Sequence, residues 1–169
     1  METIIIEKTK GVESHFELFK WAMKALSKDS TRYNLSKVYI GKNRVVCCDG
    51  ARFHMFRHNR SYAPGMYEIK SQDKKAIVLS KVTEGTYPNI AKVIPKHGGK
   101  KLDFLERSIN RGSSYTSVVR YMEPGTTVNL DYFEDCVTEG QWQVTIHPNN
   151  GPLYFKDCNR TAVIMPARM

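Results

Sequence analysis

The stretch that most clearly indicates the fold is residues 44–58, RVVCCDGARFHMFRH. The first part, Arg44–Cys48, is a short run of β-branched and apolar residues typical of a strand. Asp49-Gly50 is a dipeptide typical of a turn, and the strand pattern resumes over Arg52–His58. The stretch therefore predicts a strand, a turn and a second strand.

The residues before this stretch predict one strand, one helix and the start of a hairpin. Thr3–Glu7 is β-branched and short, as strands are. Ser14 is expected to open a helix, because Glu17 three residues later completes a capping box. Lys37–Ile40 is expected to pair with the strand at 44–48. Helical spacing predicts that the helix buries Phe16, Phe19, Met23 and Leu26.

The residues after it alternate between extended and helical patterns. Met66–Lys70 and Ala76–Lys81 are predicted strands, 83–95 is irregular, and 96–101 has the composition of a linker. The remaining expected elements are a helix over 102–109, a strand over 117–122, a helix over 130–137 capped by Asn129, and three closing strands over 142–146, 153–156 and 161–165. The order strand, helix, several strands thus occurs near each end, and the fold class is α+β.

The charge balance favours a polyanionic partner. The 169 residues include 26 Lys and Arg against 17 Asp and Glu, a net charge of +9. Nucleic acid is the commonest partner of such a surface. Lys20, Lys24 and Lys28 are four residues apart on the predicted helix and, together with Arg32, are candidate DNA-binding residues. A solvated helix face explains the same pattern equally well.

The cysteines indicate a reducing compartment. Cys47 and Cys48 are neighbours, Cys136 and Cys158 stand apart, and there is no C-x-x-C pair. The short apolar run near the N-terminus is followed at once by charged residues, unlike a signal peptide. No segment approaches the roughly 18 apolar residues that span a membrane. We expect a cytoplasmic protein with no membrane partner.

Few residues suggest catalysis. His54 and His58 lie in a strand pattern without a third metal ligand, and Cys48 has no recognisable base beside it. No nucleotide-binding, metalloprotease or hydrolase motif is present. We expect a protein that is not an enzyme and needs no cofactor or metal. The carboxylates of the last predicted helix are expected to be solvated: Asp131, Glu134, Asp135 and Glu139.

Three separated segments carry a resemblance to a known family. They are VVCCDGARF (45–53), AIVLSKVTEGTYPNIAKVIP (76–95) and the C-terminal AVIMPARM (162–169). Together, and in this order, they resemble the bacterial β sliding clamp, the processivity subunit of the replicative DNA polymerase. The residues that match the family's motifs are Asp49, Gly50, Arg52, Ser80, Lys81, Gly85, Pro88, Val93, Pro95, Met165, Pro166 and Arg168.

The resemblance implies a site and a set of partners. In the family these segments converge on a hydrophobic pocket that accepts short linear peptides from polymerases, the clamp loader and repair proteins. Three departures indicate altered peptide preference or a vestigial pocket: Ala51 replaces a His, Asn89-Ile90 replaces Asp-Tyr, and Ala167 replaces a Met. The implied pocket residues are Cys48, Gly50, Ala51, Arg52, Phe53, Pro88, Lys92, Val93, Val163, Met165, Pro166, Ala167 and Arg168.

The resemblance also implies a DNA-clamp-like architecture of antiparallel sheets with a few helices. Residues 1–95 resemble the middle domain of the clamp, and 96–169 resemble a reduced last domain. Alternatively, one clamp domain has two halves, 1–60 and about 125–169, that flank an insertion. Family rings are built from six similar domains, so a two-domain chain is expected to close as a homo-oligomeric trimer.

Two functions remain open from the sequence. The first is a sliding-clamp-like scaffold that binds duplex DNA without reading its sequence and docks replication proteins. The second is a clamp decoy or regulator, encoded by a phage or mobile element, that binds clamp-interacting proteins without encircling DNA. The net charge favours the first, and the acidic helix favours the second.

Overall fold

The computed structural model describes residues 1–10, 14–29, 31–96, 98–106, 111–138 and 140–168. Within these residues the chain folds into two compact units, Met1–Pro88 and Asn89–Met169. All strand pairs within each unit are antiparallel. In the described residues no helix is long and apolar enough to cross a membrane.

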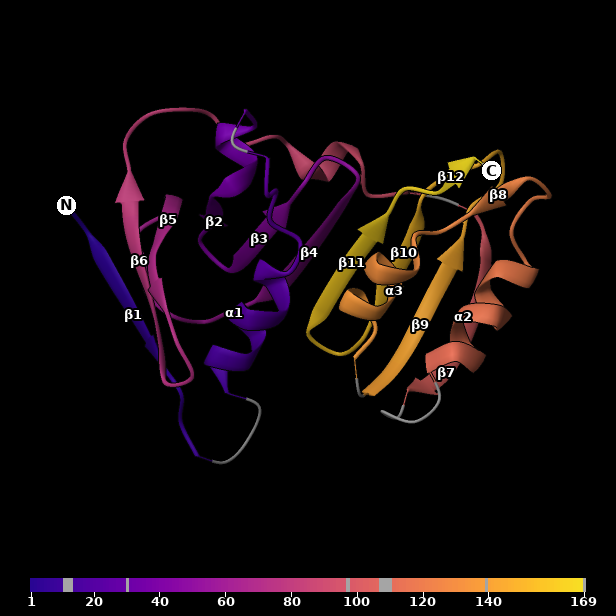
Figure 1. Ribbon diagram of the computed structural model, residues 1–169, viewed down its shortest axis with the longest axis horizontal. Helices are drawn as coiled ribbons and strands as arrows, with labels where there is room; N and C mark the ends of the chain where they lie inside the picture. Colours follow the sequence, from indigo (N-terminus) through magenta and orange to yellow (C-terminus); the bar gives the residue numbers. More distant parts are fainter. Residues whose placement is uncertain (11–13, 30, 97, 107–110, 139, 169) are drawn as a thin grey trace. The chain divides into compact units, whose positions relative to one another are not determined.

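The first unit is one sheet with a helix on one face (Figure 1). Its strand order is β1-β6-β5-β2-β3-β4. Helix α1 (His15–Met23) packs against β3 and β4. The strands are β1 (Thr3–Glu7), β2 (Val38–Ile40), β3 (Arg44–Cys48), β4 (Arg52–Arg57), β5 (Gly65–Gln72) and β6 (Ala76–Val82).

Helix α1 begins where the capping residue predicts it. The Ser14 side chain accepts a hydrogen bond from the Glu17 N–H at 3.4 Å, which satisfies one of the free amides of the first turn. The helix ends at Met23, three residues before Leu26, the last residue that it was expected to bury. Leu18 and Trp21 are also buried, and the apolar face is therefore wider than the sequence predicts.

The register of β3 and β4 sets the core of the first unit. Phe56 and His54 lie opposite Val45 and Cys47, on the face that packs against α1. The Phe19 and Phe56 rings meet edge to face at 5.1 Å between centroids. The His54 ring stacks on Trp21 at 4.4 Å, and its Nδ1 lies 2.9 Å from the Trp21 carbonyl oxygen.

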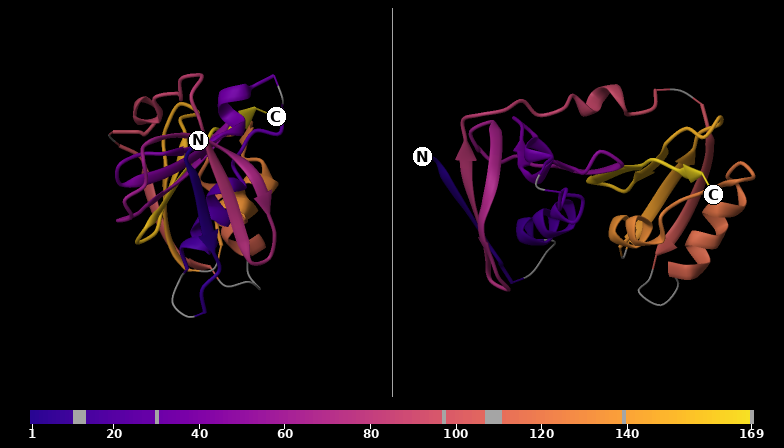
Figure 2. Two further views of the ribbon diagram at one scale, coloured as in Figure 1. Left: turned by 90° about the vertical axis from the view of Figure 1, so that its left-hand side faces the viewer. Right: turned by 45° about the horizontal axis from the view of Figure 1, so that its top comes forward.

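The second unit is a four-stranded sheet with two helices. Its strand order is β11-β10-β9-β7, and a separate pair joins β8 to β12. Helices α2 (Arg111–Arg120) and α3 (Leu130–Cys136) contact each other, β7 and β11, and lie on the same face of the sheet (Figure 2). The strands are β7 (Lys100–Glu106), β8 (Thr126–Thr127), β9 (Gly140–Ile146), β10 (Leu153–Lys156), β11 (Arg160–Ile164) and β12 (Ala167–Arg168).

Two expected elements of the second unit are wrong. The predicted helix at 102–109 is strand β7, which pairs with β9 from Lys100 to Glu106; Ile109 lies outside the described residues. The predicted strand at 117–122 belongs mainly to helix α2. Ser114 and Val118, four residues apart, are both buried, so tertiary packing overrides the β-branched composition. The α+β class and the other main elements are confirmed.

Candidate functional site

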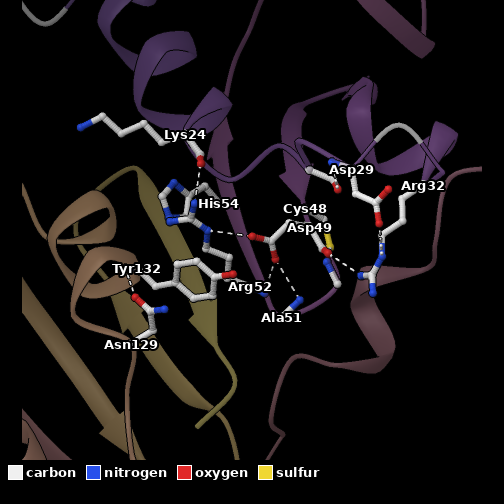
Figure 3. A network of polar contacts seen from close by, with 12 residues as sticks. Lys24, Asp29, Arg32, Cys48, Asp49, Ala51, Arg52, His54, Asn129 and Tyr132 are labelled. Atoms are coloured by element: carbon white, nitrogen blue, oxygen red, sulfur yellow. Dashed lines mark hydrogen bonds and ion pairs between the residues drawn. The ribbon is translucent and has the colours of Figure 1, made fainter. Parts of the chain in front are cut away.

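The turn between β3 and β4 is held by the Asp49 side chain (Figure 3). Asp49 Oδ1 accepts hydrogen bonds from the N–H groups of Ala51 and Arg52, at 2.9 and 3.0 Å. Gly50 has a φ of 95°, a left-handed conformation that glycine adopts without strain. The turn thereby presents Gly50 and Ala51 as the end of the hairpin.

Arg52 ties this turn to helix α1 (Figure 3). Its side chain is 7% exposed, its Nε lies 3.1 Å from Asp49 Oδ2, and its Nη2 donates to the Lys24 carbonyl at 2.6 Å. A cation at the carboxyl end of a helix also complements the helix dipole. Arg52 is therefore an anchor for the turn.

Arg32 lies at the same turn. Its Nη1 donates to the Asp49 carbonyl at 2.9 Å, and its Nε is 3.8 Å from Asp29 Oδ2. A Cβ at position 50 would lie only 2.5 Å from Arg32 Nη1 and 3.6 Å from Leu35 Cδ1. Its charge groups Arg32 with the lysines in the sequence, whereas its contacts connect it to the turn. No motif in the sequence indicates that Leu35 lies beside Gly50.

The segment between β6 and Pro88 packs against the sheet of the first unit through an aromatic residue, Tyr87. The Tyr87 ring stacks on Tyr39 at 5.0 Å, and its hydroxyl donates to the Val46 carbonyl at 3.4 Å. Burial raises the pKa of the Tyr87 hydroxyl. Asn34 Nδ2 donates to the Thr86 carbonyl at 2.9 Å, which adds a second tie. Pro88 itself is exposed.

Cys48 is half-buried at the end of β3. Its Sγ accepts a hydrogen bond from the Gly50 N–H at 3.3 Å. Burial raises the pKa of this thiol, and the Asp49 carboxylate raises it further. A thiol held in its protonated form is a poor nucleophile. Phe53, next to the turn on the opposite strand, is 1% exposed and belongs to the core.

The other predicted pocket residues belong to the second unit. Lys92 ends a short 3-10 helix (Ile90–Lys92), and Val93 follows it with 50% of its surface exposed. Val163 is buried in β11, whereas Met165 just after that strand is 44% exposed. Pro166 is half-buried, and Ala167 and Arg168 are exposed in β12. Met165 and Val93 thus offer apolar surface, and their convergence with the β3–β4 turn stays a prediction.

The predicted DNA-binding lysines do not share one helix. Lys20 lies in α1, where its Nζ is 3.9 Å from Glu17 Oε2, while Lys24 is the cap residue. Lys28 lies beyond the helix. All three are exposed, so each can reach a polyanion, but the regular stripe expected from the four-residue spacing is not formed.

The second unit repeats the aspartate–arginine arrangement of the turn. Asp157 Oδ1 accepts from the Asn159 and Arg160 N–H groups at 3.0 and 2.7 Å, and Arg160 Nε donates to Asp157 Oδ2 at 2.7 Å. The Arg160 guanidinium also donates to Thr138 Oγ1, just after α3, and lies over the Trp142 ring. We call the Asp49–Arg52 and Asp157–Arg160 pairs the two pins.

The two histidines of the β4 stretch have structural partners. His54 and His58 contact the carbonyl oxygens of Trp21 and Gly41, at 2.9 and 3.0 Å. The described residues contain no group of three or more His, Cys, Asp or Glu that could hold a metal ion. Asp131 and Glu134 of α3 are exposed as expected, whereas Asp135 is half-buried; Glu139 lies outside the described residues.

Comparison with known proteins places the fold. No family model matches the sequence, and no curated protein matches it significantly. Solved structures, however, match over the whole chain, and they define the class: the chain has the fold of the DNA polymerase III β sliding clamps. The resemblance drawn from the three sequence segments is confirmed at the level of the fold.

Individual clamps show how far the likeness extends. The Thermotoga maritima β subunit aligns with a TM-score of 0.67 and 14% identity, over 99% of this chain and 65% of that one. The Caulobacter crescentus β subunit aligns with a TM-score of 0.66 and 18% identity, over 100% of this chain and 66% of that one. A Bartonella birtlesii sliding clamp bound to griselimycin aligns with a TM-score of 0.65 and 17% identity, over 99% of this chain and 66% of that one. The chain thus spans about two thirds of the length of these clamps.

Proposed function

We propose that this chain is a non-enzymatic sliding-clamp-like scaffold, which binds duplex DNA without base readout and docks replication proteins through a peptide pocket. The clamp fold over the whole chain is the observation that carries the proposal. The T. maritima and C. crescentus structures are β subunits of DNA polymerase III. The partners we propose, a polymerase or a clamp loader with a clamp-binding motif, are those that the family resemblance implies.

The proposed pocket takes its residues from the three family-like segments, which include the β3–β4 turn and Met165. The turn is rigid because Asp49 and Arg52 hold it, and Arg32 and Leu35 flank Gly50. A rigid turn loses little entropy when a peptide binds. Met165 supplies an unbranched side chain that adapts to varied partners. We therefore add Leu35 to the predicted pocket residues and move Arg32 from the DNA surface to the pocket.

We assign the two compact units to clamp domains. The first unit and the irregular segment after it, residues 1–95, correspond to a middle domain, and 96–169 correspond to a reduced last domain. The two pins support this assignment, because in each unit an aspartate holds an arginine three residues later at the turn between two paired strands.

Reversal of three lysine charges is expected to weaken duplex binding. In Lys20→Glu/Lys24→Glu/Lys28→Glu, we expect affinity to fall for every duplex sequence alike, and the slope of log affinity against log salt to flatten by about 2.7. Fluorescence anisotropy with two unrelated duplexes over a salt series measures both. The matched control is Lys42→Glu/Lys70→Glu/Lys74→Glu, which changes the charge equally at exposed positions of the same unit. Equal losses in the two variants, or a loss confined to one sequence, would contradict the DNA surface.

The oligomeric state tests the architecture. In the described part of each unit, β1 and β7 are edge strands with a single partner each, and Ile5 on β1 is 60% exposed. Edge strands of this kind can pair with the edge strand of another chain. Head-to-tail pairing closes a ring when the rotation between neighbouring subunits adds up to a full turn. Light scattering at micromolar protein is expected to give a trimer. A dimer would contradict the two-domain assignment.

A regulator that binds clamp-interacting proteins without encircling DNA is the second candidate. Helix α3 carries exposed Asp131 and Glu134 and no basic residue, and such a face repels phosphate. A strict monomer that retains peptide binding and lacks duplex binding would favour this function over the scaffold.

A further inference from the structure

The sheet of the second unit has a polar face turned away from its helices. Phe155 of β10 meets Phe133 of α3 edge to face at 5.7 Å, so Phe155 points to the helix side. Tyr154 and Lys156, its neighbours in the strand, point to the opposite side. Thr145 and Gln143 of β9 lie directly opposite them in the ladder and share that side.

A hollow on this face is lined by basic and polar side chains. Its volume is about 280 Å³, and its lining includes Lys96, Lys101 and Lys156 but no carboxylate. Among the residues that the structure describes, none of these three lysines forms an ion pair. Asp103 of β7 lies in the row of Gln143 and accepts a hydrogen bond from its Nε2 at 3.0 Å. Asp103 therefore shares the face but does not line the hollow, and the charged side chains of the lining are all lysines.

The spacing of the lysines suits a polymer. Lys101 lies opposite Thr145, and Thr145 lies opposite Tyr154, while Lys156 lies opposite Gln143. Lys101 and Lys156 are thus two strands apart and two residues apart along the strands. Sheet geometry places their Cα atoms about 12 Å from each other. At that spacing the two ammonium groups face different anionic groups, as on a phosphate backbone, and not one small ion.

An aromatic ring lies beside the lysines: Tyr154 is two residues from Lys156 in β10 and in the same cross-strand row as Lys101. Tyr154 is half-buried and shares the hollow with His147, whose Nδ1 lies 2.8 Å from the Pro152 carbonyl oxygen. A positive groove with an aromatic ring is the arrangement that holds single-stranded nucleic acid, in which bases stack on the ring and lysines contact phosphates. A duplex keeps its base faces stacked inside, and an acidic peptide offers no planar base to the ring.

We propose that the hollow lined by Lys96, Lys101, Tyr154 and Lys156 binds single-stranded nucleic acid. This activity goes beyond duplex binding and peptide docking, and does not depend on either. Chemically, the site takes a flexible polyphosphate chain with exposed bases and shows little sequence preference, because every base has a face that can stack.

The test is fluorescence anisotropy of the 169-residue chain with a labelled oligothymidylate of about 20 nucleotides. We expect Lys101→Glu/Lys156→Glu to weaken binding more than tenfold and to flatten the log–log salt slope by about 1.4. Tyr154→Ala is expected to weaken binding about 5- to 150-fold, whereas Tyr154→Phe, which keeps a ring, retains it. Lys101→Gln/Lys156→Gln repeats the test without introducing new negative charge.

Lys70→Glu/Lys74→Glu is the matched control, since it makes the same change in charge at exposed positions of the first unit. Equal weakening by the control overturns the site, as does unchanged binding in the lysine variants. Equal losses for a duplex of the same length, or a loss seen only with polyglutamate, overturn the assignment to single strands. Binding of a clamp-type peptide by the same variants is expected to be unchanged, which separates this proposal from the proposed function.

Discussion

Met165→Asp is expected to abolish binding of a clamp-type peptide, one with an apolar-aromatic pair after a glutamine. The intact chain is expected to bind such a peptide with micromolar affinity, about −8 kcal/mol, as one anchored linear motif does. Aspartate places a charge where the peptide buries apolar side chains, and that charge has no partner in the complex. We expect a loss of more than 100-fold, measured by calorimetry or anisotropy.

Leu130→Asp is the matched control for this change. Leu130 is 46% exposed, close to the 44% of Met165, and lies in the same unit. It is the first residue of α3, where an aspartate is tolerated because the helix dipole favours negative charge. The control is expected to bind peptide normally. Unchanged binding in Met165→Asp, or equal losses in the two variants, would remove Met165 from the pocket.

Arg52→Ala is expected to lower the free energy of unfolding of the first unit by about 3 kcal/mol. The substitution leaves the Asp49 carboxylate, which is 12% exposed, without its cation, and leaves the Lys24 carbonyl without this donor. The loss falls at the low end for a broken buried pair, because Asp49 keeps its two backbone donors. Urea unfolding followed by Trp21 fluorescence, in a Trp142→Phe background, measures the first unit alone.

Arg32→Ala serves as the control for this pin. Its ion pair with Asp29 and its hydrogen bond to the Asp49 carbonyl are both exposed, and surface ion pairs contribute roughly 0–1 kcal/mol. A double-mutant cycle with Asp49→Ala is expected to show strong coupling to Arg52, so the combined loss is smaller than the sum of the single losses. Additive losses, or a loss for Arg52→Ala no larger than for Arg32→Ala, would contradict a structural role for the pin.

The parts of the fold that could be predicted depend on local chemistry. The β3–β4 turn followed from Asp49-Gly50, and the start of α1 followed from Ser14 and Glu17, because each involves residues at most three apart. Strand β7 and helix α2 were not predictable in the same way. Their residues fit both the helical period and the strand period. Pairing with β9 makes the first a strand, and burial of Val118 favours a helix for the second.

The candidate site shows the same division. Residues within the three family-like segments could be named from the sequence, but Leu35 and Tyr87 could not, because their roles come from contacts with distant residues. The charge of Arg32 groups it with the lysines, whereas its hydrogen bond to the Asp49 carbonyl connects it to the turn. An aspartate three residues before an arginine occurs at Asp49–Arg52 and Asp157–Arg160, but also at the exposed pair Asp29–Arg32, so the spacing alone does not identify the two pins.

The two pins also have a consequence for the order of folding. The aspartate–arginine contact spans three residues in each unit and can form as soon as the turn does. Docking of the helix end then closes a loop of 28 residues in the first unit and 22 in the second. The entropy costs of these closures differ by only about 0.2 kcal/mol. Each unit is therefore expected to fold in the same sequence and at similar speed, with the turn formed before its helix docks.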